Sequence, residues 1–379
     1  MLQETTFYYQ LQNSPSLDLR DNRGKVHKMS FILMGLVLAL LQGRDGNLSS
    51  IHRFMSNKND WICHILNIDK QKVVSRAQLP KILQKVHLST FEKLLFSCFG
   101  IKLSETEKQW FAGDGKDLKG SILDGKSRGT AVVQLVSHDN RDVAGQLFYQ
   151  GDKESEKPTL RTVIENTGLA NQKISADALH LCPKTTSLIN EAGGIFLVGL
   201  KGNQPTLLQD MIDYANFLKP VHQLTTIDKG HGRIEKRTYY HYNIEGEYFD
   251  KRWATSSFKS LVKTIREITY VKKNITTTCV SYYISNQEVT KDKATSESLF
   301  KAVRQHWSVE VSNYTRDVTL KEDKFKTQLN GLSKTMANIR TLAVKILSMS
   351  KPKNMTAQIE RFADKTNELV TFLRKIKFL

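Results

Sequence analysis

The sequence predicts a mixed α/β protein, in which a sheet is covered by helices. Between Lys108 and Asn203 the predicted elements run strand, hairpin, helix, strand, helix, strand, which is an order typical of a mixed sheet. A second β-rich stretch extends from about Gln223 to Ser285. The chain before about Thr106 has mostly helical patterns, and a basic, helix-forming stretch ends the chain.

Composition is that of a globular protein with a polyanionic partner. The 379 residues are 40% hydrophobic and 25% charged, and at about 150 residues per domain they suggest two to three domains. The net charge is +18, and residues 320–379 contain 13 Lys or Arg against 5 Asp or Glu. Such an excess favours a polyanion as a partner. The four cysteines form no CxxC pair, so we expect reduced thiols and neither a disulfide framework nor a zinc site.

Membrane insertion is not expected. The most apolar run, Met29 to Leu41, has 13 residues, whereas a spanning helix needs about 20. The preceding 28 residues are polar and contain Asp18 and Asp21, unlike a signal peptide. We therefore predict a buried helix at Met29 and a soluble protein of the cytoplasm.

The N-terminal region, residues 1–106, is predicted to hold helices around a core. The apolar helix ends at Gly43, a second begins at Ser49, and a third begins near Ser89 or Thr90, either of which could cap it. The third helix should turn three neighbouring side chains to the core, namely Leu94, Leu95 and Cys98. This region is either a DNA-binding head or a packing domain, and the residues alone slightly favour the packing domain.

The middle of the chain alternates predicted strands and helices. Residues 108–116 indicate a short strand that runs into an Asp-Gly turn at Asp114, and residues 130–150 indicate a hairpin. Residues 158–168 indicate a helix with Pro at its start and Gly at its end. A strand ending on Asp177, a helix over 183–192 and a strand from Ile195 follow. The clearest later strands are residues 238–244 and 276–285, and residues 296–314 indicate a helix.

The sequence contains a nucleotide-binding motif, but the residues on either side of it lack the secondary structure that the motif requires. Residues 120–127 match the P-loop pattern, which requires a buried strand before the first glycine and a helix after the last residue. The preceding residues are polar and the following ones are strand-like. Without a helix N-terminus there is no array of backbone donors for phosphate, so we interpret the match as a glycine-rich loop.

Three acidic residues are the candidates for catalysis. Asp114 and Asp177 each follow a predicted strand of one sheet, where ligands usually bind, and Glu310 lies on the later helix beyond Arg304, His306 and Trp307. Converging acids repel one another unless cations lie between them. Two Mg²⁺ ions about 4 Å apart would relieve that repulsion and favour displacement at phosphorus.

Several sequence segments resemble those of a known protein family. They are DLRDNRGKVH (18–27), GDGKDLKGS (113–121), SADALH (175–180), LKGNQPTL (200–207), DKGHGRIEKR (228–237) and RQHWSVE (304–310). In this order they look like the DDE transposases of bacterial insertion sequences, in the branch that includes the H-repeat-associated proteins. The resemblance covers about residues 18–347. It implies a ribonuclease-H-like catalytic domain over 107–347, with a β-rich insertion at about 220–290, and leaves 348–379 as a basic helical tail.

The resemblance also implies a site, cofactors and partners. Asp114, Asp177 and Glu310 would be both the catalytic residues and the ligands of two Mg²⁺ ions, for which Mn²⁺ can substitute. The expected DNA contacts are Lys201, Asn203, His231, Arg233, Arg237, Arg304, His306 and Trp307, with His231, Arg233 and Arg237 in one turn of the insertion. The partners would be double-stranded DNA, as element ends and target, and a second copy of the chain in a homodimer on that DNA.

Departures from the family pattern keep alternatives open. Leu181 and Cys182 follow the second acid where the family has a small polar residue and Gln, and Val311 replaces Asn after the third acid. The Asp317-Val318 pair also arrives one residue early. The expected activity is DNA strand cleavage and strand transfer. The alternatives are a catalytically silent DNA-binding protein and a ribonuclease-H-like nuclease without strand transfer.

Overall fold

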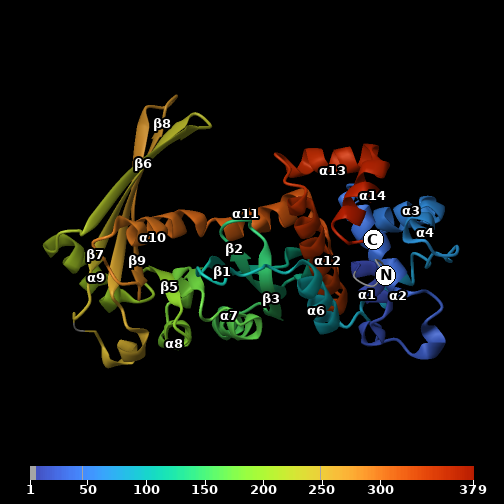
Figure 1. The fold of residues 1–379 in the computed structure, drawn as a ribbon, viewed down its shortest axis with the longest axis horizontal. Helices are drawn as coiled ribbons and strands as arrows, with labels where there is room; N and C mark the ends of the chain where they lie inside the picture. The colour runs from blue at the N-terminus through green and yellow to red at the C-terminus, as the bar shows by residue number, and fades with distance from the viewer. Residues whose placement is uncertain (1–5, 45, 248) are drawn as a thin grey trace.

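The mixed α/β class is confirmed by a nine-stranded sheet (Figure 1). The structure is a computed structural model that describes residues 6–44, 46–247 and 249–379. The strands are β1 (Trp110–Asp117), β2 (Thr130–Ser137), β3 (Val143–Gln150), β4 (Lys173–Ala176), β5 (Ile195–Leu200), β6 (His222–Gly230), β7 (Arg233–Asn243), β8 (Ser260–Tyr270) and β9 (Ile275–Ser285). Their spatial order is β3-β2-β1-β4-β5-β9-β8-β7-β6. β4 is parallel to both β1 and β5, and the other neighbours are antiparallel.

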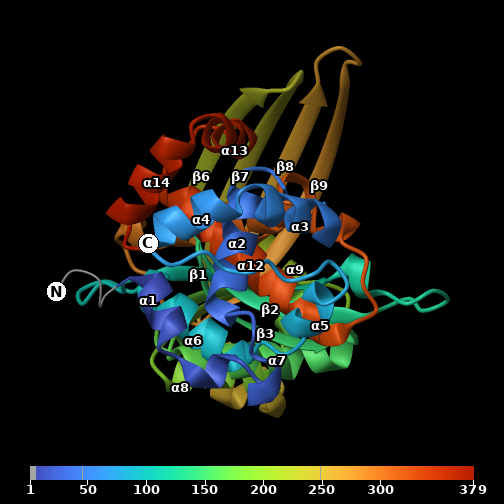
Figure 2. The ribbon, with the colours of Figure 1, turned by 90° about the vertical axis from the view of Figure 1, so that its right-hand side faces the viewer.

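Helices from both ends of the chain build one helical body (Figure 2). They are α1 (Phe7–Gln12), α2 (Met29–Leu41), α3 (Leu48–Asn57), α4 (Asn59–Leu66), α5 (Leu79–Leu83), α6 (Leu88–Phe99), α12 (Asn330–Met349), α13 (Met355–Asp364) and α14 (Thr366–Lys375). Their buried side chains form a single hydrophobic cluster. The tail helices α13 and α14 therefore belong to the same core as the N-terminal helices.

The apolar helix α2 lies at the centre of this body. All of its 13 residues are buried, as the sequence predicted. No helix within the described ranges is both long and apolar enough to cross a membrane. In α6, Leu95 is buried, and Leu94 and Cys98 pack against the core as partly buried residues.

Helices cover both faces of the sheet. α7 (Lys153–Thr167), α8 (Pro183–Glu191) and α9 (Pro205–Phe217) pack on one face, where Phe111, Ile174 and Phe196 share a cluster with residues of these helices. α10 (Lys293–Gln305) and α11 (Ser308–Tyr314) lie on the opposite face. There Val309 packs against Ala112 of β1. Alternate residues of one strand thus serve two different cores, which is the period of two expected of a strand.

The last four strands, β6 to β9, project from the rest of the molecule, and we call them the arm (Figures 1 and 2). Residues 275–280 of β9 are all exposed, as is most of β6. The β6–β7 connection places His231 and Gly232 at φ values of 52° and 72°. A two-residue turn with both central residues at positive φ matches the twist of the strands it joins. The β-rich stretch predicted before Ser285 is therefore a set of long hairpins.

Several local predictions are confirmed. The hairpin over 130–150 is β2 and β3, and α8 begins at Pro183 as expected. The loop whose sequence matches the P-loop pattern, residues 120–127, leads from the short 3₁₀ helix Lys119–Ser121 into β2. No helix follows Ser127 there, which agrees with the interpretation of a glycine-rich loop.

The predicted Asp-Gly turn is wrong. β1 continues through Asp114 and Gly115 to Asp117, and Asp114 pairs with Gln134 of β2. A Cβ atom on Gly115 would lie 2.5 Å from Cδ of Glu156. Gly115 therefore allows the Glu156 side chain to pack closely against β1, and it does not change the direction of the chain.

Three helix boundaries also differ from the prediction. α7 begins five residues before Pro158, because Asp152 accepts a hydrogen bond from the Ser155 amide and caps the helix there. α6 begins after His87, so Ser89 and Thr90 lie inside it. The helix expected over 296–314 is interrupted at His306 and Trp307, between α10 and α11.

Candidate functional site

One pocket of about 370 Å³ brings the three predicted acids together. Asp114 comes from β1, Asp177 directly follows β4, and Glu310 lies in the first turn of α11. The remaining walls are formed by strands of the arm and by the α10–α11 junction. Side chains almost 200 residues apart in sequence thus face the same space.

The parallel pairing of β1 and β4 places the two aspartates side by side. Gly113 pairs with Ala176 in this ladder, so Asp114 and Asp177 follow at the same level. Asp177 also caps the short 3₁₀ helix Ala178–His180 by accepting a hydrogen bond from the Leu179 amide at 3.0 Å. The chain turns away from the sheet at this point, and the turn opens the space in front of both carboxylates.

Several acidic side chains lie close together in the site and repel one another. Burial, and after it the nearby charges of Asp177 and Glu156, raise the pKa of Asp114 to about 7, while the charge of His180 acts in the opposite direction. An isolated aspartate has a pKa near 4. The pocket therefore holds a carboxyl group whose ionised form lacks a compensating cation.

Glu156 of α7 was missed by the sequence analysis. Its side chain is buried, Tyr149 donates a hydrogen bond to its Oε2 at 3.0 Å, and His180 Nε2 lies 3.3 Å from its Oε1. The same His180 nitrogen lies 4.0 Å from Asp177. Burial alone would raise the pKa of Glu156, but the hydrogen bond and charge of His180 bring it below its usual value. The fully buried imidazole thus links a fourth acid to the aspartate pair.

The α10–α11 junction, which precedes Glu310, is held against β4 by a contact of His306. Ser175, two residues before Asp177, hydrogen-bonds both His306 Nδ1 at 3.0 Å and His138 Nε2 at 2.8 Å. Burial lowers the pKa of His306 to about 4, so this imidazole is neutral near pH 7. Glu310 itself is exposed, and partial burial raises its pKa. Among the described residues, no group of three His, Cys, Asp or Glu is close enough to hold a metal ion together.

Three arginines, Arg237, Arg266 and Arg304, line the same pocket as the acids. Glu235 of β7 is buried, with Arg237 ion-paired to it and Arg266 donating to its Oε2 at 2.8 Å. Burial lowers the pKa of Arg237, and the positive charge of Arg304 acts in the same direction. Three arginines therefore surround a single glutamate, which leaves positive charge facing the pocket. Arg266 carried no signal in the sequence.

The predicted DNA contacts fall into two groups. Lys201, Arg237, Arg304, His306 and Trp307 line the acid pocket, and Trp307 is 55% exposed. The rest of the predicted set lies elsewhere.

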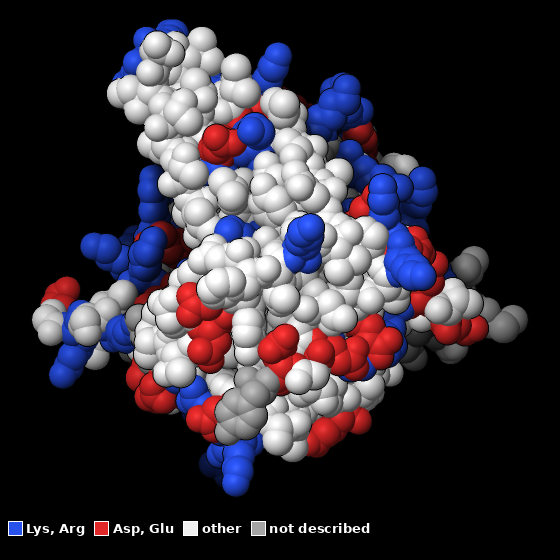
Figure 3. All heavy atoms as spheres, turned by 90° about the vertical axis from the view of Figure 1, so that its left-hand side faces the viewer, with Lys and Arg blue, Asp and Glu red and all other residues white. Residues whose placement is uncertain are grey.

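Asn203 donates to the Ala178 carbonyl at 2.6 Å and so supports the turn after Asp177. His231 and Arg233 lie exposed at the β6–β7 tip, whereas Arg237 is four residues along β7. The expectation of one turn holding all three is therefore wrong, because the hairpin turn contains two residues only. Figure 3 shows basic side chains over the arm and acidic ones in a band below it.

The positions that depart from the family pattern have structural roles. Leu181 is buried in the core under the sheet, and Cys182 precedes the first turn of α8. Asp317 lies in a π-helical turn, Thr315–Thr319, and is ion-paired with Lys116 of β1. Lys116 also contacts Glu322 Oε2 at 2.6 Å. These contacts fasten the end of α11 to the strand that carries Asp114.

Comparison with known proteins gives relatives along most of the chain. No family model matches it. Over 334 residues it is 25% identical to the "Putative protein YbfL" of Escherichia coli K12, which covers 86% of each chain. Over 340 residues it is 24% identical to the "Putative transposase YncI" of Escherichia coli O157:H7, covering 87% of this chain and 84% of that protein. The YncI protein of strain K12 is 26% identical over 238 residues, 61% of this chain and 94% of that protein. The chain is thus similar, along more than four-fifths of its length, to a protein named as a putative transposase.

Proposed function

We propose that the protein is a DDE transposase, which cuts DNA at the ends of an insertion sequence and joins those ends to a target. The observation that carries the proposal is the convergence of Asp114, Asp177 and Glu310 on one pocket. The similarity to putative transposases gives it independent support. The branch that includes the H-repeat-associated proteins remains the one suggested by the sequence strings.

A ribonuclease-H-like catalytic domain is part of this proposal. The strand order β3-β2-β1-β4-β5, with β1 to β3 antiparallel and β4 and β5 parallel to β1, supports it. The arm joins this sheet beside β5 and returns to α10, in the place expected for a β-rich insertion before the helix of the third acid. The two aspartates then come from the centre of the sheet and the glutamate from the helix that follows the insertion.

The residues of the pocket fit divalent metal ions. The donors are carboxylate oxygens, which Mg²⁺ prefers, and the raised pKa of Asp114 indicates negative charge that a cation would neutralise. Asp114 and Asp177 would hold two Mg²⁺ ions, or Mn²⁺. Because the described residues contain no group of three acids close enough to hold a metal ion, Glu310 would complete the set by moving toward the aspartates from α11. When bound, the metal would lower the pKa of a water nucleophile and neutralise charge on the phosphate under attack.

The protein's own side chains would position the DNA. Arg304, Arg237 and Lys201 supply positive charge in the pocket wall, where a phosphodiester would lie against them. Trp307 presents an exposed aromatic face on which an unpaired base can stack. The hydrogen bond between Ser175 and His306 fixes the α10–α11 junction between Arg304 and Glu310.

Two assays test the proposal and separate it from its alternatives. Purified protein is incubated with plasmid carrying the element's ends and Mg²⁺, and strand nicking is measured, followed by joining of pre-cleaved ends to a second plasmid. The proposal expects both reactions. Nicking without joining would indicate a ribonuclease-H-like nuclease, and DNA binding without nicking in Mg²⁺ or Mn²⁺ would indicate a silent DNA-binding protein.

A further inference from the structure

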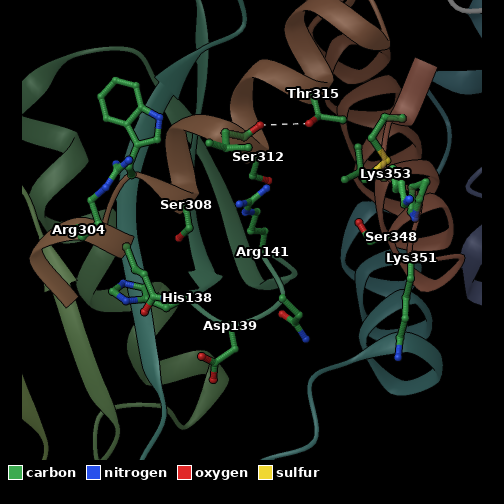
Figure 4. A pocket seen from close by; sticks show the side chains of 17 residues that line it. His138, Asp139, Arg141, Arg304, Ser308, Ser312, Thr315, Ser348, Lys351 and Lys353 are labelled. Atoms are coloured by element: carbon green, nitrogen blue, oxygen red, sulfur yellow. Dashed lines mark hydrogen bonds between the residues drawn. The ribbon is translucent and has the colours of Figure 1, made fainter. Parts of the chain in front are cut away.

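A second pocket lies beside the acid pocket and is larger, about 740 Å³ (Figure 4). It is enclosed by the β2–β3 turn, by α11 and by the connection from α12 to α13. Arg304 and Trp307 line both pockets, so the two spaces meet at the α10–α11 junction. Figure 4 shows Arg141 in the middle of the pocket and Lys351 and Lys353 on its far side.

The charge of this pocket is strongly positive. Its ionised lining consists of four basic side chains and one acid, Asp139. Arg141, Lys351 and Lys353 are exposed, and none of the three is ion-paired with an acid of the described chain. Free basic side chains gathered around a concave surface attract an anionic ligand.

Buried polar atoms without partners give a second, independent indication of a ligand. Ser308 and Ser312 are 5% and 3% exposed, they line the pocket, and the Oγ atom of each has no hydrogen-bond partner. His138 is 3% exposed, and its Nδ1 is also unpartnered, although its Nε2 hydrogen-bonds Ser175. Leaving a buried polar group unpaired costs about 1–3 kcal/mol, so such groups usually indicate a missing partner. Hydroxyl groups next to arginine and lysine are the usual contacts of phosphate oxygens.

The walls of the pocket are held in place by contacts of their own. Lys345 of α12 donates to Asp142 Oδ2 at 2.5 Å, which fastens the β2–β3 turn to the helical body. The hydroxyl of Thr315, directly after α11, donates to the Val311 carbonyl of α11 at 3.1 Å. The pocket is thus a preformed space between fixed elements.

We propose that this second pocket binds the phosphodiester backbone of the DNA strand that continues from the acid pocket. The proposal rests on the proposed function, because it takes the DNA held at the acids as the strand that extends past Arg304. Arg141, Lys351 and Lys353 neutralise phosphates along that strand, and Ser308 and Ser312 donate hydrogen bonds to phosphate oxygens. Val311, at the position where the family has Asn, lies in the lining of this pocket.

The test compares two triple variants that lose the same charge. One is Arg141→Ala/Lys351→Ala/Lys353→Ala, and the control is Lys184→Ala/Lys219→Ala/Lys251→Ala, three exposed lysines on the side of the sheet covered by α8 and α9. Affinity for a fluorescein-labelled DNA duplex is measured by anisotropy without metal across a salt series. Each lost phosphate contact reduces the magnitude of the negative slope of log K against log salt by about 0.9. The slope of the pocket variant should therefore be smaller in magnitude than that of wild type by about 2 to 3. The control should keep the wild-type slope.

A second variant tests the hydroxyl groups. Ser308→Ala/Ser312→Ala removes two unpartnered polar atoms, so the free protein should keep or raise its melting temperature. Its affinity for the same duplex should fall at least about tenfold, because two hydrogen bonds to charged oxygens are lost. A protein that only loses its fold would instead melt at lower temperature.

Failure of this inference is distinguishable from failure of the proposed function. If the pocket variant keeps the slope of its control, or if the serine variant binds DNA as tightly as wild type, the second pocket is not a DNA site, whatever the cleavage activity. If wild type binds DNA with the predicted slopes but does not nick it in Mg²⁺ or Mn²⁺, the cleavage proposal fails while the pocket assignment stands.

Discussion

Glu322 is a buried acid that joins the strand of Asp114 to the helical body. Its side chain is 4% exposed and contacts Lys116 of β1 at 2.6 Å. Burial alone would raise the pKa of Glu322, but the charges of Lys116, Arg316 and Arg340 hold it at about 2. Arg316 and Arg340 are themselves 1% exposed, so the cluster is closed to water.

The substitution Glu322→Gln should be strongly destabilising. Lowering a pKa from 4.5 to about 2 corresponds to about 3 kcal/mol, at about 1.4 kcal/mol for each factor of ten. Because the folded-state pKa lies below the ordinary value, this stabilisation is complete above pH 4.5 and is lost as the pH falls toward 2. The difference between wild type and variant should therefore shrink by about 2 kcal/mol between pH 7 and pH 3.

Urea denaturation at pH 7, pH 4 and pH 3 measures this difference. The control is Glu368→Gln, which removes an exposed ion pair with Arg361 at 2.7 Å and should cost less than about 1 kcal/mol. The prediction fails if Glu322→Gln is as stable as this control at pH 7, or if its loss of stability relative to wild type stays constant down to pH 3. Either result would mean that the cluster does not stabilise the ionised glutamate.

Two further predictions concern the site, and a third concerns the glycine-rich loop. Glu156→Gln should slow Mg²⁺-dependent nicking without weakening DNA binding, because Glu156 acts through His180 and does not line the acid pocket; nicking at the wild-type rate in a plasmid assay would contradict this. Trp307→Ala should weaken binding of single-stranded DNA by about 1–3 kcal/mol in an anisotropy titration, whereas its melting temperature should not change, since the ring is mostly exposed. Lys126→Ala should leave nicking intact, because no helix follows Ser127 to form a phosphate site; ATP hydrolysis that this substitution abolishes would overturn the interpretation of the loop.

Local signals in the sequence were sufficient for many elements but not for tertiary packing. Pro183 and the β-rich runs around residues 138–142 predicted α8 and the first hairpin, since helix starts and turns depend on a few neighbouring residues. Asp114 was predicted at a turn because Asp-Gly usually makes one. The real reason for Gly115 is Glu156 beneath it, a contact across about 40 residues that no local pattern records.

The missed acid did have a local signal. Pro158 suggested a helix start, yet Asp152 with Glu154 and Glu156 in the following turn is the better N-terminal pattern, and it extends α7 far enough to include Glu156. The arginine cluster around Glu235 and the unpartnered hydroxyls of α11 have no such signal. They depend on the arm and the helical body meeting α10 and α11, which only the folded chain shows.

Asp114 and Asp177 are proposed to act with Glu310 in metal-dependent DNA cleavage, and the decisive measurement is the rate of Mg²⁺-dependent nicking in isosteric variants. Asp114→Asn, Asp177→Asn and Glu310→Gln are compared with Asp210→Asn, an exposed acid on α9, and DNA affinity is measured on the same preparations. The three site variants should lose cleavage by orders of magnitude while their salt-dependent DNA binding stays near that of wild type. Asp210→Asn should behave as wild type. Cleavage by Asp114→Asn or Asp177→Asn at the wild-type rate would contradict the proposal.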